Sequence, residues 1–186
     1  MTMEQFLRWL AAWATLWIVN PALAAQDDPR LNALFEALAE AEDPRDATLL
    51  ETSIWLIWHQ SGDPRIDALM AEGIEAMDET EYAKAEAIFG RIVERAPRFA
   101  EGWNKRATVR YLRGNYQGSI DDIDKTIALE PRHFGALSGL GLVYLALGRE
   151  EAALDAFKRA LAVHPRLPGT AEQIRALEEK LRGRRI

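Results

Sequence analysis

Three groups of residues in this sequence have types and spacings that could do chemistry. The stretch from Glu130 to Gly148 joins an arginine and a histidine to a Gly-Leu-Gly motif of the kind seen in nucleotide-binding loops. Arg106 and Arg110 are four residues apart, which places both guanidinium groups on one side of a helix. Three carboxylates follow closely: Asp121, Asp122 and Asp124.

The glycines do not form a nucleotide-binding fingerprint. A dinucleotide loop requires a preceding strand, the full G-x-G-x-x-G motif and a helix that opens there. The residues after Gly141 are Leu142, Val143 and Tyr144, and the surrounding pattern is helical throughout. We therefore assign these glycines structural roles.

No catalytic, metal or cofactor site emerges from the remaining polar residues. The aspartate cluster lacks the glycine turn and the distal glutamate of a calcium loop. Cysteine is absent, and the three histidines, His59, His133 and His164, are too scattered to suggest a metal site. We expect no cofactor, no metal and no enzymatic activity.

Charge is distributed unevenly along the 186 residues. Asp27 to Glu86 contains 16 acidic and 4 basic residues, a balance of −12, whereas Ala87 to Ile186 has 18 basic and 12 acidic residues, a balance of +6. Nucleic-acid binding favours an extended cationic face, so this division argues against a nucleic-acid partner. It is typical of two solvated faces or of docking to a partner.

The first 25 residues have the layout of a secretory signal peptide. Trp9 to Val19 is an apolar run, Asn20-Pro21 breaks it, and Ala22-Leu23-Ala24 supplies small residues for a signal peptidase. The run is shorter than the roughly 20 residues of a membrane span. We expect export, most simply to the periplasm, with a mature chain starting at Ala25 or Gln26. An uncleaved N-terminal anchor is the alternative.

A period of 34 residues organises the chain from Ile66 onward. Pro97, Pro131 and Pro165 are spaced by 34 and 34 residues, and divide it into blocks 66–99, 100–133 and 134–167. Alanine and leucine dominate the aliphatic residues, which favours helix. Small residues, turn residues and bulky residues recur at the eighth, fifteenth and twenty-fourth positions: Gly73, Ala107 and Gly141; Thr80, Gly114 and Gly148; Phe89, Ile123 and Phe157. Each block predicts two amphipathic helices that cross at the small residues.

This pattern resembles the tetratricopeptide repeat, whose W-x2-L-G-x2-Y, A-x3-F and P signature the blocks follow in register. The resemblance implies an all-α fold, a right-handed α-solenoid of antiparallel helix pairs. Residues 26–65 are expected to form an N-terminal helical hairpin, a degenerate repeat. Residues 168–186 are expected to form a capping helix and a basic tail, with Thr170 and Gln173 as a capping box.

The resemblance also implies a binding surface, the concave groove lined by the first helix of each repeat. Carrying the family's groove positions onto this sequence gives mostly apolar residues that suit a peptide segment or helix of a partner protein. The candidates are Met70, Ile74, Met77, Asn104, Thr108, Tyr111, Ser138, Leu142 and Leu145. An element of the protein itself is the other possible occupant of this groove.

The two arginines depart from the family pattern. Arg106 and Arg110 stand where leucine and tyrosine are typical, at positions that face the partner helix. Buried arginines require carboxylate partners. We predict an internal ion pair with Asp121, Asp122 or Asp124, and the alternative is an arginine clamp for a carboxylate of a partner.

Together these features predict a non-enzymatic protein-interaction scaffold or adaptor of the cell envelope. The alternative is an envelope assembly component held at the membrane by an uncleaved N-terminus or by the basic C-terminal half.

Overall fold

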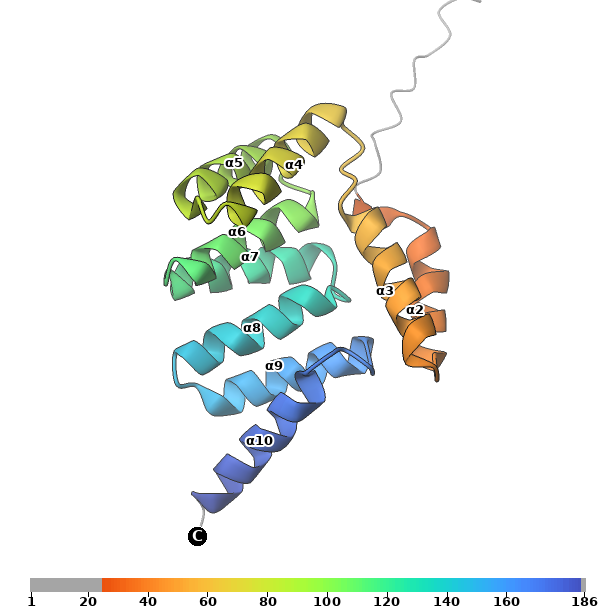
Figure 1. Ribbon diagram of the computed structural model, residues 1–186, viewed down its shortest axis with the longest axis vertical. Coiled ribbons are helices and arrows are strands. Elements are labelled where there is room, and N and C mark those ends of the chain that lie inside the picture. Colours follow the sequence, from red (N-terminus) through yellow and green to blue (C-terminus); the bar gives the residue numbers. More distant parts are fainter. Residues whose placement is uncertain (1–24, 185–186) are drawn as a thin grey trace, which may run out of the picture.

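The computed structural model describes residues 25–184, and within them the protein is a stack of helices (Figure 1). The predicted signal segment lies outside the described residues, apart from Ala25. The elements are η1 Ala25–Asp27, α2 Arg30–Glu40, α3 Pro44–Trp58, α4 Pro64–Asp78, α5 Tyr82–Arg95, α6 Ala100–Leu112, α7 Tyr116–Leu129, α8 Phe134–Ala146, α9 Glu150–Val163 and α10 Thr170–Gly183. The all-α solenoid fold is confirmed. None of the helices in residues 25–184 combines the length and apolar character needed to cross a membrane.

Three helix pairs, α4–α5, α6–α7 and α8–α9, form the repeats. Each pair is closed by the same turn, in which the fifteenth residue of the block has a left-handed backbone: φ is 60° at Thr80, 76° at Gly114 and 68° at Gly148. The next amide then donates to a carbonyl five residues back, as from Asn115 to Arg110 at 2.8 Å. This geometry satisfies carbonyls at the helix end. Two of the three turns use glycine, which adopts the conformation without steric cost.

Small residues allow the two helices of a repeat to touch. A Cβ atom added to Gly73 would lie 2.5 Å from a ring carbon of Phe89, and one added to Gly141 would lie 2.5 Å from a ring carbon of Phe157. Both phenylalanines are fully buried. The eighth and twenty-fourth positions therefore form an interlocking pair, which fixes how closely the helices pack.

Helix α10 covers the last repeat through Leu177 and Leu181, with Leu177 in a small core with Phe157. The expected capping box does not form. Gly169, with φ 72°, is the N-cap, and no side chain caps the helix. The left-handed glycine places Thr170 inside the first turn, one residue beyond the position from which its hydroxyl could cap.

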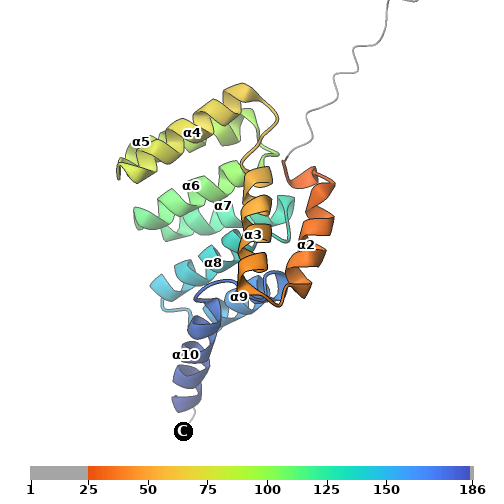
Figure 2. The same ribbon diagram turned by 45° about the vertical axis from the view of Figure 1, so that its right-hand side comes forward.

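The N-terminal hairpin α2–α3 lies beside the stack, where α3 crosses it (Figures 1 and 2). Trp58 and Phe35 of the hairpin share a core with Phe134, Val163 and Leu167 of the third repeat. The segment expected as a degenerate repeat thus forms two helices that fold back along the repeats and do not extend the stack beyond α4. The reason is the tryptophan-rich face of α3, which is buried against the loops and first helices of later repeats.

Candidate functional site

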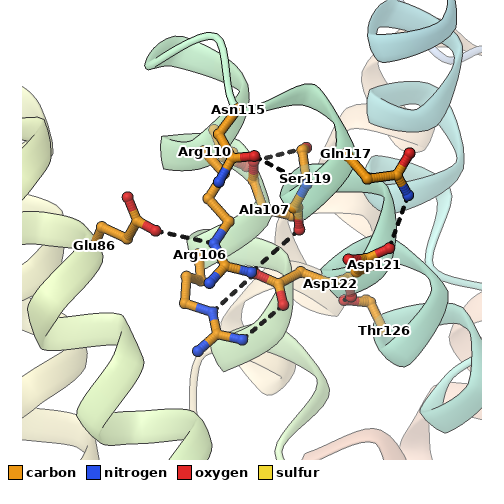
Figure 3. A network of polar contacts seen from close by, with 12 residues as sticks. Glu86, Arg106, Ala107, Arg110, Asn115, Gln117, Ser119, Asp121, Asp122 and Thr126 are labelled. Carbon is orange, nitrogen blue, oxygen red and sulfur yellow. Dashed lines mark hydrogen bonds and ion pairs between the residues drawn. The ribbon is translucent and has the colours of Figure 1, made fainter.

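The two arginines of α6 meet a single buried carboxylate on α7 (Figure 3). Arg106 donates from Nε and Nη2 to the two oxygens of Asp122, at 2.8 and 2.7 Å. Arg110 donates from Nη1 to Asp122 Oδ2 at 2.9 Å. Of the other two candidate acids, Asp121 accepts a hydrogen bond from Gln117, and Asp124 is exposed.

A second acid, Glu86 of α5, extends this cluster to the first repeat. Arg110 Nε donates to Glu86 at 3.0 Å, and Arg113 also donates to it. Burial acts to raise the pKa of Glu86, but the hydrogen bonds from Arg110 and Arg113 outweigh it and hold the pKa below its usual value. Sequence reasoning missed this acid because it lies on a different repeat. Arg106 and Arg110 are thus both paired with carboxylates of the protein itself.

The interface between α3 and the repeats is built around an aromatic stack. The ring of Trp58 lies flat on that of His133, with centroids 4.1 Å apart and planes 9° from parallel. Trp55 packs edge-on against His133 and Phe134. Its indole also reaches Gly135, where an added Cβ would lie 2.7 Å from a ring carbon. Close contact here requires that Gly135 has no side chain.

Beneath the stack lies the fully buried carboxylate of Glu101, on α6. His133 Nε2 is 2.9 Å from one of its oxygens, while Lys105 Nζ and His59 Nε2 are 3.2 and 3.4 Å from the other. His133 Nδ1 accepts from the amide of Ala136 at 3.1 Å, so Nε2 carries the proton and donates it to Glu101. Burial acts to raise the pKa of Glu101, but the bonds from His133 and His59 and the charge of Lys105 outweigh it, and the pKa lies well below its usual range.

A second histidine–glutamate contact joins the middle of α3 to the third repeat. His164 Nε2 lies 3.2 Å from Glu51 Oε2. Arg166 donates to the carbonyl of Ala41 at 2.7 Å. All three histidines of the sequence therefore lie at the interface between hairpin and repeats. The sequence did not indicate this shared location, because the three histidines are far apart along the chain. The tryptophans Trp55 and Trp58 were the one sequence feature that could have indicated a buried face on this helix.

A cavity of about 280 Å³ remains between α3 and the concave face of α6 and α8. Its lining is mostly apolar, with a few hydroxyl and amide groups. The lining residues are Glu51, Trp55, Asn104, Ala107, Thr108, Tyr111, Ser119, Ile123, Phe134, Gly135, Ser138, Gly139, Leu142, Val143, Leu167 and Pro168. Helix α3 thus covers part of the concave groove, and the rest of the groove remains as this cavity beside α3.

The structure brings five of the nine groove candidates together in this cavity: Asn104, Thr108, Tyr111, Ser138 and Leu142. The others lie elsewhere. Met70 is buried in the core of the first repeat, with Ile74 and Met77 packed against that core, and Leu145 packs against the cluster under α10. The cavity is bounded by α3 and the second and third repeats, so the groove positions of α4 lie outside it.

Among the described residues 25–184, no group of three or more acidic, histidine or cysteine side chains could hold a metal ion. The charged groups around the cavity form structural contacts, because Glu51 pairs with His164 and Lys105 with Glu101. What the cavity offers a ligand is therefore shape, apolar surface and hydroxyl groups.

Comparisons with known proteins agree with this architecture. The sequence model of the family described as "Tetratricopeptide repeat" matches residues 70–128 and 113–169. A TPR repeat-containing protein of Rhizobium etli is 36% identical over 156 residues, which cover 84% of this chain and 76% of that protein. The crystal structure of MamA is similar in fold, with a TM-score of 0.60, 21% identity and 83% of both chains covered. So is the first TPR domain of Spaghetti (RPAP3) bound to the HSP90 peptide SRMEEVD, with a TM-score of 0.60, 19% identity, and 62% of this chain and 92% of that chain covered. This chain belongs to the tetratricopeptide repeat family.

Proposed function

We propose that this protein is a non-enzymatic adaptor that binds a segment of a partner protein in the cavity between α3 and the first helices of the repeats. The observation that carries the proposal is the cavity itself, about 280 Å³ in volume and lined by α3, α6 and α8. Ligand sites are concave, mostly apolar and equipped with a few polar groups. The RPAP3 domain, whose fold is similar, was solved with a peptide bound.

Site-specific crosslinking tests this proposal in cells that produce the protein. Leu142 and Leu147 are 39% and 37% exposed, but only Leu142 lines the cavity. A photoreactive amino acid at position 142 should trap a discrete partner, whereas the same group at position 147 should not. The substitution Leu142→Asp should reduce capture of that partner, while Leu147→Asp leaves it unchanged. Equal trapping from both positions would place binding outside the cavity.

We also propose that the adaptor works in the cell envelope after export. The support is the signal-peptide layout of residues 1–25. In addition, Ala25 and Gln26 are both buried, and Gln26 donates from its side chain to the carbonyl of Arg98 at 2.6 Å, so a cut before Ala25 leaves the folded part whole. Fractionation with N-terminal sequencing tests this. A soluble periplasmic chain starting at Ala25 or Gln26 supports it, an intact chain in the membrane fraction supports the tethered alternative, and an intact cytoplasmic chain contradicts both.

A further inference from the structure

We infer that the cavity takes a tryptophan side chain of the partner segment, and that its indole N–H donates a hydrogen bond to Oδ1 of Asn104. This inference rests on the proposed function, because it names the partner residue that binds at the same site. Three features of the described residues carry it: an unused acceptor on a buried side chain, an indole already bound in the cavity wall, and a lining whose one charged residue is already paired.

The buried side chain of Asn104 is fixed in one orientation by Glu101. Asn104 is 7% exposed, and its Nδ2 lies 3.0 Å from Glu101 Oε2. The pKa of Glu101 lies well below its usual range, so this carboxylate is ionised at neutral pH and can only accept hydrogen bonds. Asn104 must therefore donate to it from Nδ2, and the carbonyl oxygen Oδ1 is the atom that remains.

This oxygen is an acceptor without a donor. Within residues 25–184, Asn104 Oδ1 accepts no hydrogen bond, and the protein does not enclose it completely. Because Asn104 lines the cavity, the oxygen is open to a ligand there. A purely apolar ligand would cover the oxygen and leave it unsatisfied, which is costly, whereas a ligand that donates to it avoids this loss.

The neighbouring hydroxyl groups also act mainly as acceptors toward the cavity. Thr108 donates its hydrogen to the carbonyl of Asn104 at 3.0 Å, and Ser119 donates to a carbonyl of α6 at 2.8 Å. Both oxygens keep lone pairs. Of the lining hydroxyls in the described chain, those of Tyr111 and Ser138 remain able to donate. The cavity thus offers a ligand more acceptors than donors.

An indole of the chain itself is already bound to this wall in the same way. The ring of Trp55 lies against Gly135, where an added Cβ would be 2.7 Å from a ring carbon, and its Nε1 donates to Glu51 Oε1 at 3.3 Å. All three residues line the cavity. The polar atom of tryptophan is a donor only, unlike the hydroxyl of tyrosine. A partner tryptophan would therefore repeat a pairing that the cavity wall already makes.

The lining favours an uncharged occupant. Glu51 is the lining residue that carries a charge, and its two oxygens already face Trp55 Nε1 and His164 Nε2, at 3.3 and 3.2 Å. The lining includes neither lysine nor arginine, and the nearby Lys105 contacts Glu101 at 3.2 Å. A charged side chain would lose its hydration here without gaining a free partner, which disfavours it relative to a neutral indole.

The floor of the cavity leaves room for the two fused rings. A Cβ atom added to Gly139 on α8 would meet a single neighbouring atom within 4 Å, Cδ1 of Ile123, at 4.0 Å. With about 280 Å³, the cavity is roughly twice the size of an engineered apolar cavity of ~150 Å³ that holds benzene. An indole therefore fits without movement of the helices.

Three uncharged peptides with blocked ends test the inference on the mature protein. They share one glycine- and serine-rich sequence and differ at the central residue, which is tryptophan, 1-methyltryptophan or phenylalanine. We expect the tryptophan peptide to shift the backbone amide resonances of Ser138 and Leu142 and the side-chain amide resonances of Asn104. It should bind about tenfold more tightly than either of the other two, the factor for one hydrogen bond to a buried acceptor.

Variants separate the hydrogen bond from the shape of the cavity. Asn104→Leu removes the acceptor and should bind the tryptophan and 1-methyltryptophan peptides equally, whereas Ser138→Ala, in the same cavity, should keep the preference. Gly139→Leu fills the floor and should abolish binding. Its matched control is Gly90→Leu, because Gly90 is also a helical glycine with no atom near its added Cβ and lies outside the cavity. Thermal unfolding of each variant verifies that it is folded.

Each contrary result has one meaning. Equal binding of the tryptophan and 1-methyltryptophan peptides by the parent protein overturns the hydrogen bond, and this comparison needs no variant. A preference that persists in Asn104→Leu overturns Asn104 as the acceptor, and binding that survives Gly139→Leu overturns the cavity as the place where the ring binds. If none of the peptides binds, or the phenylalanine peptide binds as tightly, the inferred tryptophan is wrong. In all these cases a crosslinked partner at position 142 would still uphold the proposed function, and loss of that crosslink would be its separate failure.

Discussion

At Asp122 one carboxylate allows a repeat to carry two arginines on an inner helix face. Its side chain is 2% exposed, and those of Arg106 and Arg110 are 15% and 21% exposed. Removing one partner of a buried ion pair leaves the other charges without compensation, which costs more than the pair contributes relative to an apolar substitute. Asp122 is therefore needed to compensate the positive charges of the two arginines, and the ion pairs add little stability relative to apolar side chains at the same positions.

Replacing this carboxylate should strongly destabilise the protein. We expect Asp122→Asn to lower the free energy of unfolding by about 3 kcal/mol, because it leaves the guanidinium group of Arg106 facing a neutral amide and leaves Arg110 with Glu86 alone. Urea unfolding followed by circular dichroism measures the change. The matched control is Asp124→Asn on the exposed side of the same helix, which should stay within about 0.5 kcal/mol of the parent protein. Similar losses in both variants would mean that Asp122 has no special role.

The buried Glu101 predicts a loss of stability in acid. Its pKa lies below the value of about 4.3 expected in the unfolded chain. It therefore stabilises the fold above pH 4.3, and this contribution is lost as the pH falls through the folded-state pKa. Urea unfolding between about pH 7 and pH 3 should show falling stability below pH 4.3. Glu101→Gln should weaken that dependence, and an unchanged pH profile in this variant would assign the loss to other groups.

Among the elements, α8 has glycines with opposite roles within one turn. Gly141 faces Phe157 at the crossing with α9, while Gly139 faces the cavity. The 34-residue period made Gly141 predictable, because the equivalent positions hold Gly73 and Ala107. The role of Gly139 could not be predicted, because it depends on the space that α3 leaves above it.

A single methyl group should distinguish the two glycines. Gly141→Ala should cost about 1–3 kcal/mol, since the added Cβ would overlap the buried ring of Phe157. Gly139→Ala should raise stability by about 0.5–1 kcal/mol, because alanine favours helix and meets no close atom. Thermal unfolding compares the two variants directly. If both change stability in the same direction, the crossing is less tightly packed than the structure indicates.

At the scale of the whole molecule, the sequence predicted the repeats more fully than the hairpin. Prolines 34 residues apart and recurring small positions predicted three helix pairs, and α4 to α9 form them. The helical pattern of residues 26–65 is compatible with a hairpin at the end of the stack or folded back along it. The choice depends on contacts such as Glu51 with His164, 113 residues apart. Local periodicity contains no information about such a pairing.

Trp58 should hold the hairpin against the repeats. It is 1% exposed and stacks on His133, so Trp58→Ala should cost about 3–5 kcal/mol. Hydrogen exchange should then accelerate in α2 and α3, while α9 and α10 keep their protection. The control is Leu56→Ala, at a position on the same helix that is 61% exposed. Uniform acceleration through all helices would show that hairpin and repeats unfold as one unit.

The folded-back hairpin also has a consequence for how the protein is made. Its helices are synthesised first, yet the surfaces that bury Trp55 and Trp58 include His133 and Phe134, and its outer contacts reach His164 and Arg166. Until those residues have emerged, the tryptophans of α3 lack their partners in the repeats, and Trp58 has only the contacts within its own hairpin, such as Phe35. Such non-local contacts slow folding and leave apolar surface open to other molecules. The growing chain therefore carries an incompletely covered aromatic face until His133 and Phe134 emerge, and this is the interval in which a chaperone would find it.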